Sequence, residues 1–120
     1  MTEQKEQDSK KILNIALEAL DDLRAENVST MLVEHITDMM EYIVIATATS
    51  RQHAVSLGKH LKEQAKHKSV EILGMEGLDN GEWILVDLGD VVVHIMLEAT
   101  RTYYELEKLW DIPRLKANEG

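Results

Sequence analysis

Cysteine is absent from this 120-residue sequence, and that absence removes several classes of chemistry. Disulfides, thiolate nucleophiles, and zinc or iron–sulfur sites that use cysteine ligands are all excluded. Phenylalanine is absent as well, and six methionines help to fill the interior in its place. No apolar run is long enough to cross a membrane, and the N-terminal residues are polar, unlike a signal peptide. We therefore expect a cytoplasmic protein that makes no contact with a membrane.

Positive charge is scarce, because 13 lysines and arginines stand against 22 acidic residues and the net charge is −9. An acidic chain repels phosphate backbones, which argues against direct, salt-driven binding of nucleic acid. A basic protein is a better partner for it, although the same charge can serve solubility alone. The length and the apolar share of 44% predict one domain with a core of its own.

Apolar residues recur at three- and four-residue steps in some segments and cluster with β-branched residues in others, which predicts three helices and five strands. The first helix is expected to begin at Ser9 and to stop at Asn27. The second begins with a capping box formed by Thr49 and Gln52, and the third begins near Glu98. The strands are expected at 28–33, 42–48, 70–75, 83–86 and 91–96.

This order predicts an α/β fold in which a mixed five-stranded sheet has helices packed on it. The segment 42–75 is expected to form a right-handed parallel crossover, followed by an antiparallel hairpin. Residues 1–8 and 113–120 are expected to be flexible, which places the domain at 9–112. The third helix should end at Pro113 and pack on the sheet through an apolar stripe of Ala99, Tyr103, Leu106 and Trp110.

The segment 81–97, GEWILVDLGDVVVHIML, carries the most information, because two β-rich runs flank a turn-forming cluster. With Leu88-Gly89 at the tip, Trp83 would face His94 and Asp87 would face Asp90. One face of this hairpin is aliphatic throughout and is expected in the core; it consists of Ile84, Val86, Val91, Val93 and Ile95. The other face combines a tryptophan, a histidine and two carboxylates with aliphatic residues, so function is expected there.

Three histidines, His53, His60 and His67, recur every seven residues along the second helix. Metal ligands on one helix usually need three- or four-residue spacing, whereas these rings are roughly 10 Å apart at a rise of about 1.5 Å per residue. We interpret them as a solvated helix face rather than a metal site. Ser50 is interpreted as a helix cap and not as a nucleophile, because the sequence has no G-x-S-x-G motif.

The pair Asp87 and Asp90 leaves two interpretations open. Paired carboxylates can hold a divalent ion for phosphoryl transfer, so a nucleotidyltransferase-like, magnesium-dependent enzyme is the alternative function. Aspartates at turn ends also accept hydrogen bonds from nearby backbone N–H groups, and no phosphate-cradling Gly-rich loop lies upstream. Turn chemistry thus explains both residues without catalysis.

A tryptophan in a small domain is usually part of the core, and this remains one interpretation of Trp83. The opposite face of the hairpin already supplies five aliphatic residues for burial, however. Trp83 can therefore join Leu85, Val92 and Met96 in an apolar patch with an acidic rim, the makeup of a surface for a basic protein. The candidate partner-binding residues are Trp83, Asp87, Asp90, His94 and Met96.

Long motifs then connect the sequence to a known family. The run that starts at Glu76, E-G-x3-G-E-W-I-L-V-D-L-G-D-V-V-V-H-I-M, is followed by Arg101, by Y-E-L-E from Tyr104 and by Leu109-Trp110. Upstream motifs occur in the same order, namely L-D-D-L at 20–23, T-D at 37–38, Y-I-V-I-A-T at 42–47 and T-S-R at 49–51. Over roughly residues 10 to 111, the sequence resembles the ribosomal silencing factor family (RsfS, also called Iojap).

The resemblance implies a non-enzymatic factor without a cofactor that binds the large ribosomal subunit at ribosomal protein uL-fourteen. It implies a block of small-subunit joining that represses translation in starvation or stationary phase, and a link to large-subunit assembly. It also implies a nucleotidyltransferase-like fold without the catalytic motif, and often a homodimer. Trp83 matches the motif tryptophan and is the expected anchor, with Tyr104, Leu109 and Trp110 as further candidates. Ala48 stands where the family commonly has glycine.

Overall fold

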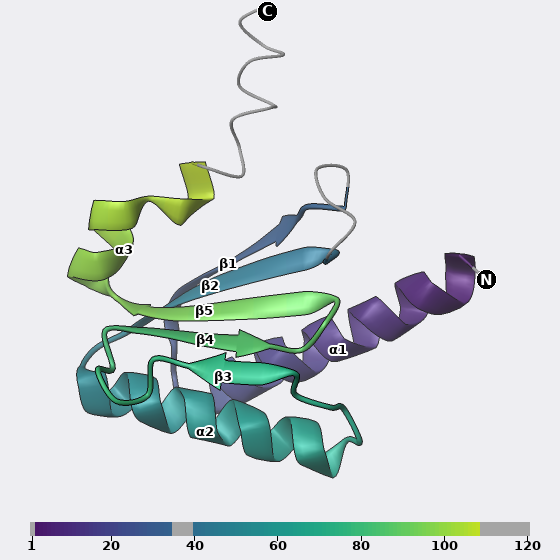
Figure 1. The fold of residues 1–120 in the computed structure, drawn as a ribbon, viewed down its shortest axis with the longest axis horizontal. Helices are drawn as coiled ribbons and strands as arrows, with labels where there is room; N and C mark the ends of the chain where they lie inside the picture. The colour runs from purple at the N-terminus through teal and green to yellow at the C-terminus, as the bar shows by residue number, and fades with distance from the viewer. Residues whose placement is uncertain (1, 35–39, 109–120) are drawn as a thin grey trace, which may run out of the picture.

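Five strands form one mixed sheet with the order β1-β2-β5-β4-β3, in a computed structural model that describes residues 2–34 and 40–108 (Figure 1). The elements in chain order are α1 (Thr2–Asp22), β1 (Glu26–Leu32), β2 (Tyr42–Ala48), α2 (Arg51–His67), β3 (Gly74–Glu76), β4 (Trp83–Asp87), β5 (Val91–Leu97) and α3 (Glu98–Tyr104). The predicted α/β fold with a mixed five-stranded sheet is confirmed.

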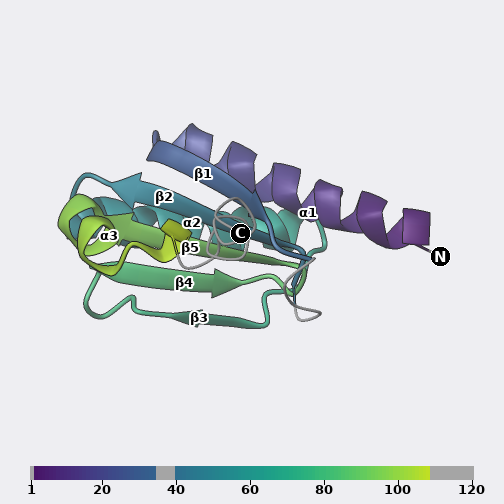
Figure 2. The same ribbon diagram turned by 90° about the horizontal axis from the view of Figure 1, so that it is seen from above.

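The helices α1 and α2 cover one face of the sheet, and α3 lies on the other side (Figure 2). The predicted apolar stripe of α2 is buried in full and consists of Ala54, Leu57, Gly58, Leu61 and Ala65. It packs against the aliphatic face of the hairpin, where Ile84, Val86, Val91, Val93 and Ile95 are all inaccessible to solvent. This aliphatic face is therefore core, as expected.

Strand directions partly confirm the predicted crossover. β2 pairs with β5 in parallel, and β4 runs antiparallel to both β5 and β3. β3 is consequently parallel to β2, but β5 and β4 lie between them, because the hairpin inserts next to β2. β2 therefore lies inside the sheet with nearly every residue buried, as its unbroken apolar sequence predicts.

The predicted bounds of the first helix are wrong at both ends. α1 begins at Thr2, so Ser9 lies inside the helix, where it is fully buried. The helix ends before Arg24, which adopts a left-handed φ of 59°, while the amide of Ala25 donates to the carbonyl of Leu20. Such a left-handed residue is a common helix stop. The expected stop, Asn27, belongs to β1 instead.

Two further local predictions need correction. The cap of α2 is Ser50, which has an extended backbone and whose side-chain oxygen accepts the amide N–H of His53 at 3.0 Å, whereas Thr49 donates its own amide to the His53 ring. Ser50 is thus the cap that we expected in place of a nucleophile. β3 has three residues rather than the predicted 70–75, because the preceding segment pairs only through the amide of Leu73.

The hairpin is present, but its turn lies further along the chain than predicted. The amide of Leu88 donates to the carbonyl of Val91 at 2.9 Å, so Gly89 and Asp90 form the tip. Gly89 has a φ of +88°, which glycine adopts without strain. Trp83 consequently pairs with Met96 rather than with His94. This register shift spans an even number of residues, so the strand residues keep the faces predicted for them.

Within the described residues, no helix is long and apolar enough to span a membrane. Several predictions fall outside these residues: the turn residue Asp38, the C-terminal Leu109, Trp110 and Pro113, and the tail 113–120.

Candidate functional site

The face of the sheet opposite α1 and α2 carries a second apolar cluster. Its buried members come from the segment after β1 and from β2 and β5, namely Val33, Ile43, Ile45 and Met96. Trp83, at the start of β4, and Leu106, beyond α3, pack against this cluster and are partly buried. The candidate site is therefore built where β4, β5 and the C-terminal segment meet.

Trp83 is fixed in place by its neighbour on β5. Its indole Nε1–H donates to Nδ1 of His94 at 2.9 Å, and the two ring centroids are 5.9 Å apart. Burial lowers the pKa of His94 to about 4, so the ring is neutral at neutral pH and its Nδ1 can accept this bond. The predicted cross-strand pairing of these residues was wrong, but the side chains lie diagonally across the strands and still meet.

Two tyrosines of α3 extend this arrangement toward solvent. Tyr104 lies with its ring centroid 4.8 Å from that of Trp83, and Tyr103 contacts Tyr104 edge-on at 4.9 Å. Their exposed fractions are 53% for Tyr104 and 79% for Tyr103. We call Trp83, Tyr103 and Tyr104 the aromatic cluster.

The apolar stripe predicted for the third helix is wrong at Ala99 and Tyr103, whereas Leu106 packs on the sheet as predicted. Ala99 and Tyr103, which were expected to pack on the sheet, are exposed. The stripe assumed one continuous helix as far as Pro113, but α3 ends at Tyr104, because Glu105 adopts a left-handed φ of 48°. The chain therefore changes direction after Tyr104, and Leu106 reaches the second apolar cluster from a separate turn.

The remaining predicted site residues separate. Asp87 shares the face of Trp83, and its Oδ1 accepts the amide of Gly89 at 2.9 Å. Asp90 lies at the tip, and its Oδ2 accepts the hydroxyl of Ser9 from α1, on the opposite side of the sheet. Met96 has no exposed surface, so it supports the patch from beneath instead of forming part of its surface.

The carboxylates of Asp87 and Asp90 therefore accept hydrogen bonds from different partners. The bond from the Gly89 amide is the turn contact expected for Asp87. Glu76 of β3 lies opposite Leu85 on the Trp83 face and is exposed, which adds a carboxylate that sequence reasoning did not include. Among the described residues, no group of three or more His, Asp or Glu side chains is arranged to hold a metal ion. The histidines of α2 bond separate partners: His53 the carbonyl of Leu23, and His60 the carboxylate of Asp22.

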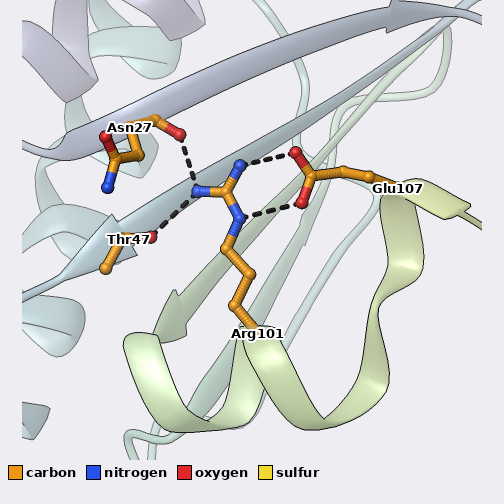
Figure 3. A network of polar contacts seen from close by, with 4 residues as sticks. All are labelled: Asn27, Thr47, Arg101 and Glu107. Atoms are coloured by element: carbon orange, nitrogen blue, oxygen red, sulfur yellow. Dashed lines mark hydrogen bonds and ion pairs between the residues drawn. The ribbon is translucent and has the colours of Figure 1, made fainter.

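A polar network attaches the C-terminal segment to the sheet (Figure 3). Arg101 donates from Nε and Nη2 to the two carboxylate oxygens of Glu107, at 3.0 and 2.7 Å. Its Nη1 donates to the carbonyl of Asn27 at 2.6 Å and to the hydroxyl of Thr47 at 2.9 Å. The Arg101 hydrogen bonds hold the pKa of Glu107 below its usual value, against the opposing effect of burial. We call these four residues the Arg101 network.

Asn27 can take part because β1 is irregular at this point. The pairing of β1 with β2 shifts register between Glu26 and Ser29, and Asn27 has a left-handed φ of 47°. A bulge leaves the extra residues outside the regular ladder, and asparagine tolerates the left-handed conformation better than most residues. The carbonyl of Asn27 is thereby available to Arg101. Neither the bulge nor the network was predicted, although Arg101 occurs among the family motif residues.

Comparisons with known proteins agree with this structure. The family model described as "Ribosomal silencing factor during starvation" matches residues 6–119. The ribosomal silencing factor RsfS of Bacillus subtilis is 42% identical over 101 residues, covering 84% of this chain and 86% of that protein. The mouse protein "Mitochondrial assembly of ribosomal large subunit protein 1" is 38% identical over 96 residues, covering 75% of this chain and 42% of that protein.

A solved structure shows the same fold. The crystal structure of a Chromobacterium violaceum protein superimposes with a TM-score of 0.83 at 38% sequence identity, covering 84% of each chain. The family model covers nearly the whole chain, and the sequence identity to these relatives is high enough to establish common ancestry. The chain belongs to the ribosomal silencing factor family.

Proposed function

We propose that this protein represses translation by docking on the large ribosomal subunit through ribosomal protein uL-fourteen, where it sterically blocks joining of the small subunit under starvation or stationary phase. The names of its relatives support the ribosomal setting, since one is a ribosomal silencing factor and another is an assembly protein of a ribosomal large subunit. The observation that carries the proposal is the half-exposed aromatic cluster on the sheet face that α1 and α2 leave uncovered.

The aromatic cluster has the physical properties of a docking centre. Tryptophan and tyrosine dominate binding energy at protein interfaces, because they bury a large area and lose little conformational entropy. Trp83 is held by His94 on one side and Tyr104 on the other, so its ring is already ordered before a partner arrives. Because the Trp83 ring is ordered before binding, the free energy of binding is not reduced by the entropy cost of ordering it.

Charge supports a basic partner for the same face. Asp87 and the exposed Glu76 lie on the Trp83 face, and the exposed Glu98 and Glu105 flank the tyrosines along the chain. The net charge of −9 attracts a basic protein over distance and repels RNA phosphates. Electrostatics of this kind favour docking on a ribosomal protein rather than on bare rRNA.

The proposed mechanism is steric and needs no cofactor and no covalent chemistry. A docked domain of 13.7 kDa at the subunit interface occupies space that the small subunit must enter. Asp87 and Asp90 contribute to the turn and to the α1 contact in this scheme, so the magnesium-dependent alternative has no observation in its favour.

Co-sedimentation with purified large subunits, a subunit-joining assay and pull-down with isolated uL-fourteen test the proposal directly. Tyr104→Ala should weaken binding by at least tenfold, because truncating an interface hot spot costs about 2 kcal/mol or more. Trp83→Ala should abolish binding, although loss of its contacts with the second apolar cluster also lowers stability. Circular dichroism and urea unfolding separate the two effects.

Leu73→Ala is the matched control, because Leu73 is an exposed apolar residue, 62% accessible, that lies away from the aromatic cluster. It should bind like the parent protein. Folded Tyr104→Ala and Trp83→Ala proteins that bind as well as the parent would refute docking through this face. Failure of the parent protein to sediment with large subunits, or to slow subunit joining, would refute the function. Analytical ultracentrifugation of the same samples tests the homodimer that the resemblance implies.

A further inference from the structure

The segment that carries Tyr104 has little packing of its own. α3 has seven residues, none of them buried, and its first turn receives no side-chain cap. A helix of this length is unstable in water by itself. Beyond it, Leu106 is the residue that packs on the second apolar cluster. The position of Tyr104 therefore depends on other contacts, and the Arg101 network supplies four hydrogen bonds among them.

The two charged residues of the network stand on either side of Tyr104 in the sequence. The bidentate pair between Arg101 and Glu107 closes the loop 101–107 around Tyr104, and Nη1 of Arg101 ties this loop to β1 and β2 (Figure 3). With the loop closed, Tyr104 stands against Trp83. Without it, the left-handed Glu105 would be the end of a short, frayed helix.

We propose that the Arg101 network is a positioning device for docking: it fixes Tyr104 against Trp83 and so assembles one binding surface from two separate parts of the chain. The inference rests on the proposed function, because it concerns the same docking face. It assigns Arg101 and Glu107 a role in affinity without any contact between them and the partner.

Direct contact with the partner is disfavoured by the geometry of Arg101. Its side chain is 14% exposed, and Nε, Nη1 and Nη2 are all engaged within the protein. A guanidinium whose hydrogen bonds are satisfied internally has little to offer a second protein.

A purely stabilising role is disfavoured as well. Ion pairs contribute little net stability when they are partly exposed, and the Glu107 side chain is 34% exposed. What a bidentate pair does supply is a fixed orientation. The contribution expected from the network is therefore mainly the order of the loop 101–107, which appears as affinity when the loop is part of an interface.

A double-mutant cycle tests the inference, with four proteins compared: the parent, Arg101→Met, Tyr104→Ala and the double variant. Dissociation constants are measured for isolated uL-fourteen and for purified large subunits. Arg101→Met should weaken binding on the order of tenfold, because the loop must then be ordered during binding. In the Tyr104→Ala background the same substitution should have almost no further effect, since it acts through Tyr104.

Two more variants separate positioning from charge. Lys108→Met removes the same charge from the same segment, but Lys108 is 73% exposed and its ion pair within the described part of the chain is with Glu105, so binding should change less than twofold. Arg101→Lys keeps the charge and loses the planar fork, so it should bind like Arg101→Met rather than like the parent.

A readout without any partner shows where Tyr104 lies. In a Trp110→Phe background, Trp83 is the only tryptophan, and acrylamide quenching of its fluorescence reports its exposure. Arg101→Met should raise quenching toward the level of Tyr104→Ala, whereas Lys108→Met should not. A merely structural role elsewhere in the fold would leave this signal unchanged in a protein that is still folded by circular dichroism.

The outcomes are distinct. If the parent binds neither uL-fourteen nor large subunits, the proposed function fails and the docking role fails with it. If the parent binds and Arg101→Met binds equally well, only the positioning inference is overturned. Equal losses from Arg101→Met in the parent and in the Tyr104→Ala background would also overturn it, because the network would then act independently of Tyr104.

Discussion

His94 makes the stability of this protein depend on pH in a way that one substitution can isolate. Burial lowers the pKa of His94 from its ordinary value of 6.5 to about 4, so the folded protein resists protonation of a ring that the unfolded chain protonates readily. His94→Gln replaces the ring with a neutral side chain that does not titrate. The pH dependence that His94 contributes should therefore disappear in this variant.

The direction and magnitude of this pH dependence follow from the linkage between proton binding and unfolding. Between pH 6.5 and pH 4 the unfolded state binds more protons than the folded state at His94, so unfolding becomes easier as the pH falls. The contribution is fully present above pH 6.5, is lost progressively down to pH 4, and is constant below that. Each unit of pKa corresponds to about 1.4 kcal/mol, which makes the full loss roughly 3.5 kcal/mol.

Urea unfolding of the parent and of His94→Gln at pH 7, 5.5 and 4 measures this difference. The stability of the parent relative to the variant should fall by about 3 kcal/mol across the range, because the titration of other groups cancels in the comparison. His67→Gln, at an exposed position of α2, controls for the loss of a histidine and should follow the parent. Parallel stability curves for the parent and His94→Gln would refute the assignment of a neutral, buried His94.

Other predictions concern the contacts that support the site. Gly77→Ala should destabilise the fold by more than about 1 kcal/mol in urea unfolding, since Gly77 has a φ of +93° and a Cβ there would overlap the carbonyl oxygen of Trp83. Gly74→Ala is the control and should be nearly neutral, because the space around Gly74 is open. Ser9→Ala should cost about 1 kcal/mol by the same measurement, because it removes the buried hydroxyl that bonds Asp90. A neutral effect of Gly77→Ala, or a neutral effect of Ser9→Ala, would contradict the corresponding contact.

The sequence was informative wherever one physical rule acted alone. Alternation along a strand has a period of two residues, so the faces of Ile84 and Trp83 were predicted correctly even though the turn position was not. The buried stripe of α2 followed in the same way from its helical period. Contacts that depend on the tertiary structure could not be predicted in this way. Asp90 is an example, because its hydrogen bond with Ser9 requires α1 to lie against the hairpin tip.

The Arg101 network could not be predicted, because the sequence itself suggests a helix that would forbid it. In one continuous helix, residues six apart lie roughly 9 Å apart along the axis, at about 1.5 Å per residue, and point in different directions. Arg101 and Glu107 would then be unable to form a bidentate pair. Their pairing exists only because Glu105 breaks the helix in a left-handed conformation.

The break comes directly after Tyr104, the tyrosine of α3 whose ring lies against Trp83. A non-glycine residue held in the left-handed region costs on the order of 1 kcal/mol and persists only where surrounding contacts outweigh it. Here the outweighing contacts are the Arg101 network and Leu106 on the second apolar cluster. A conformational cost maintained in a segment with no buried helix residue is better explained by the surface it presents than by the stability it adds. The helix break, the network and the aromatic cluster thus have one common consequence, which is the preformed surface that we propose for docking.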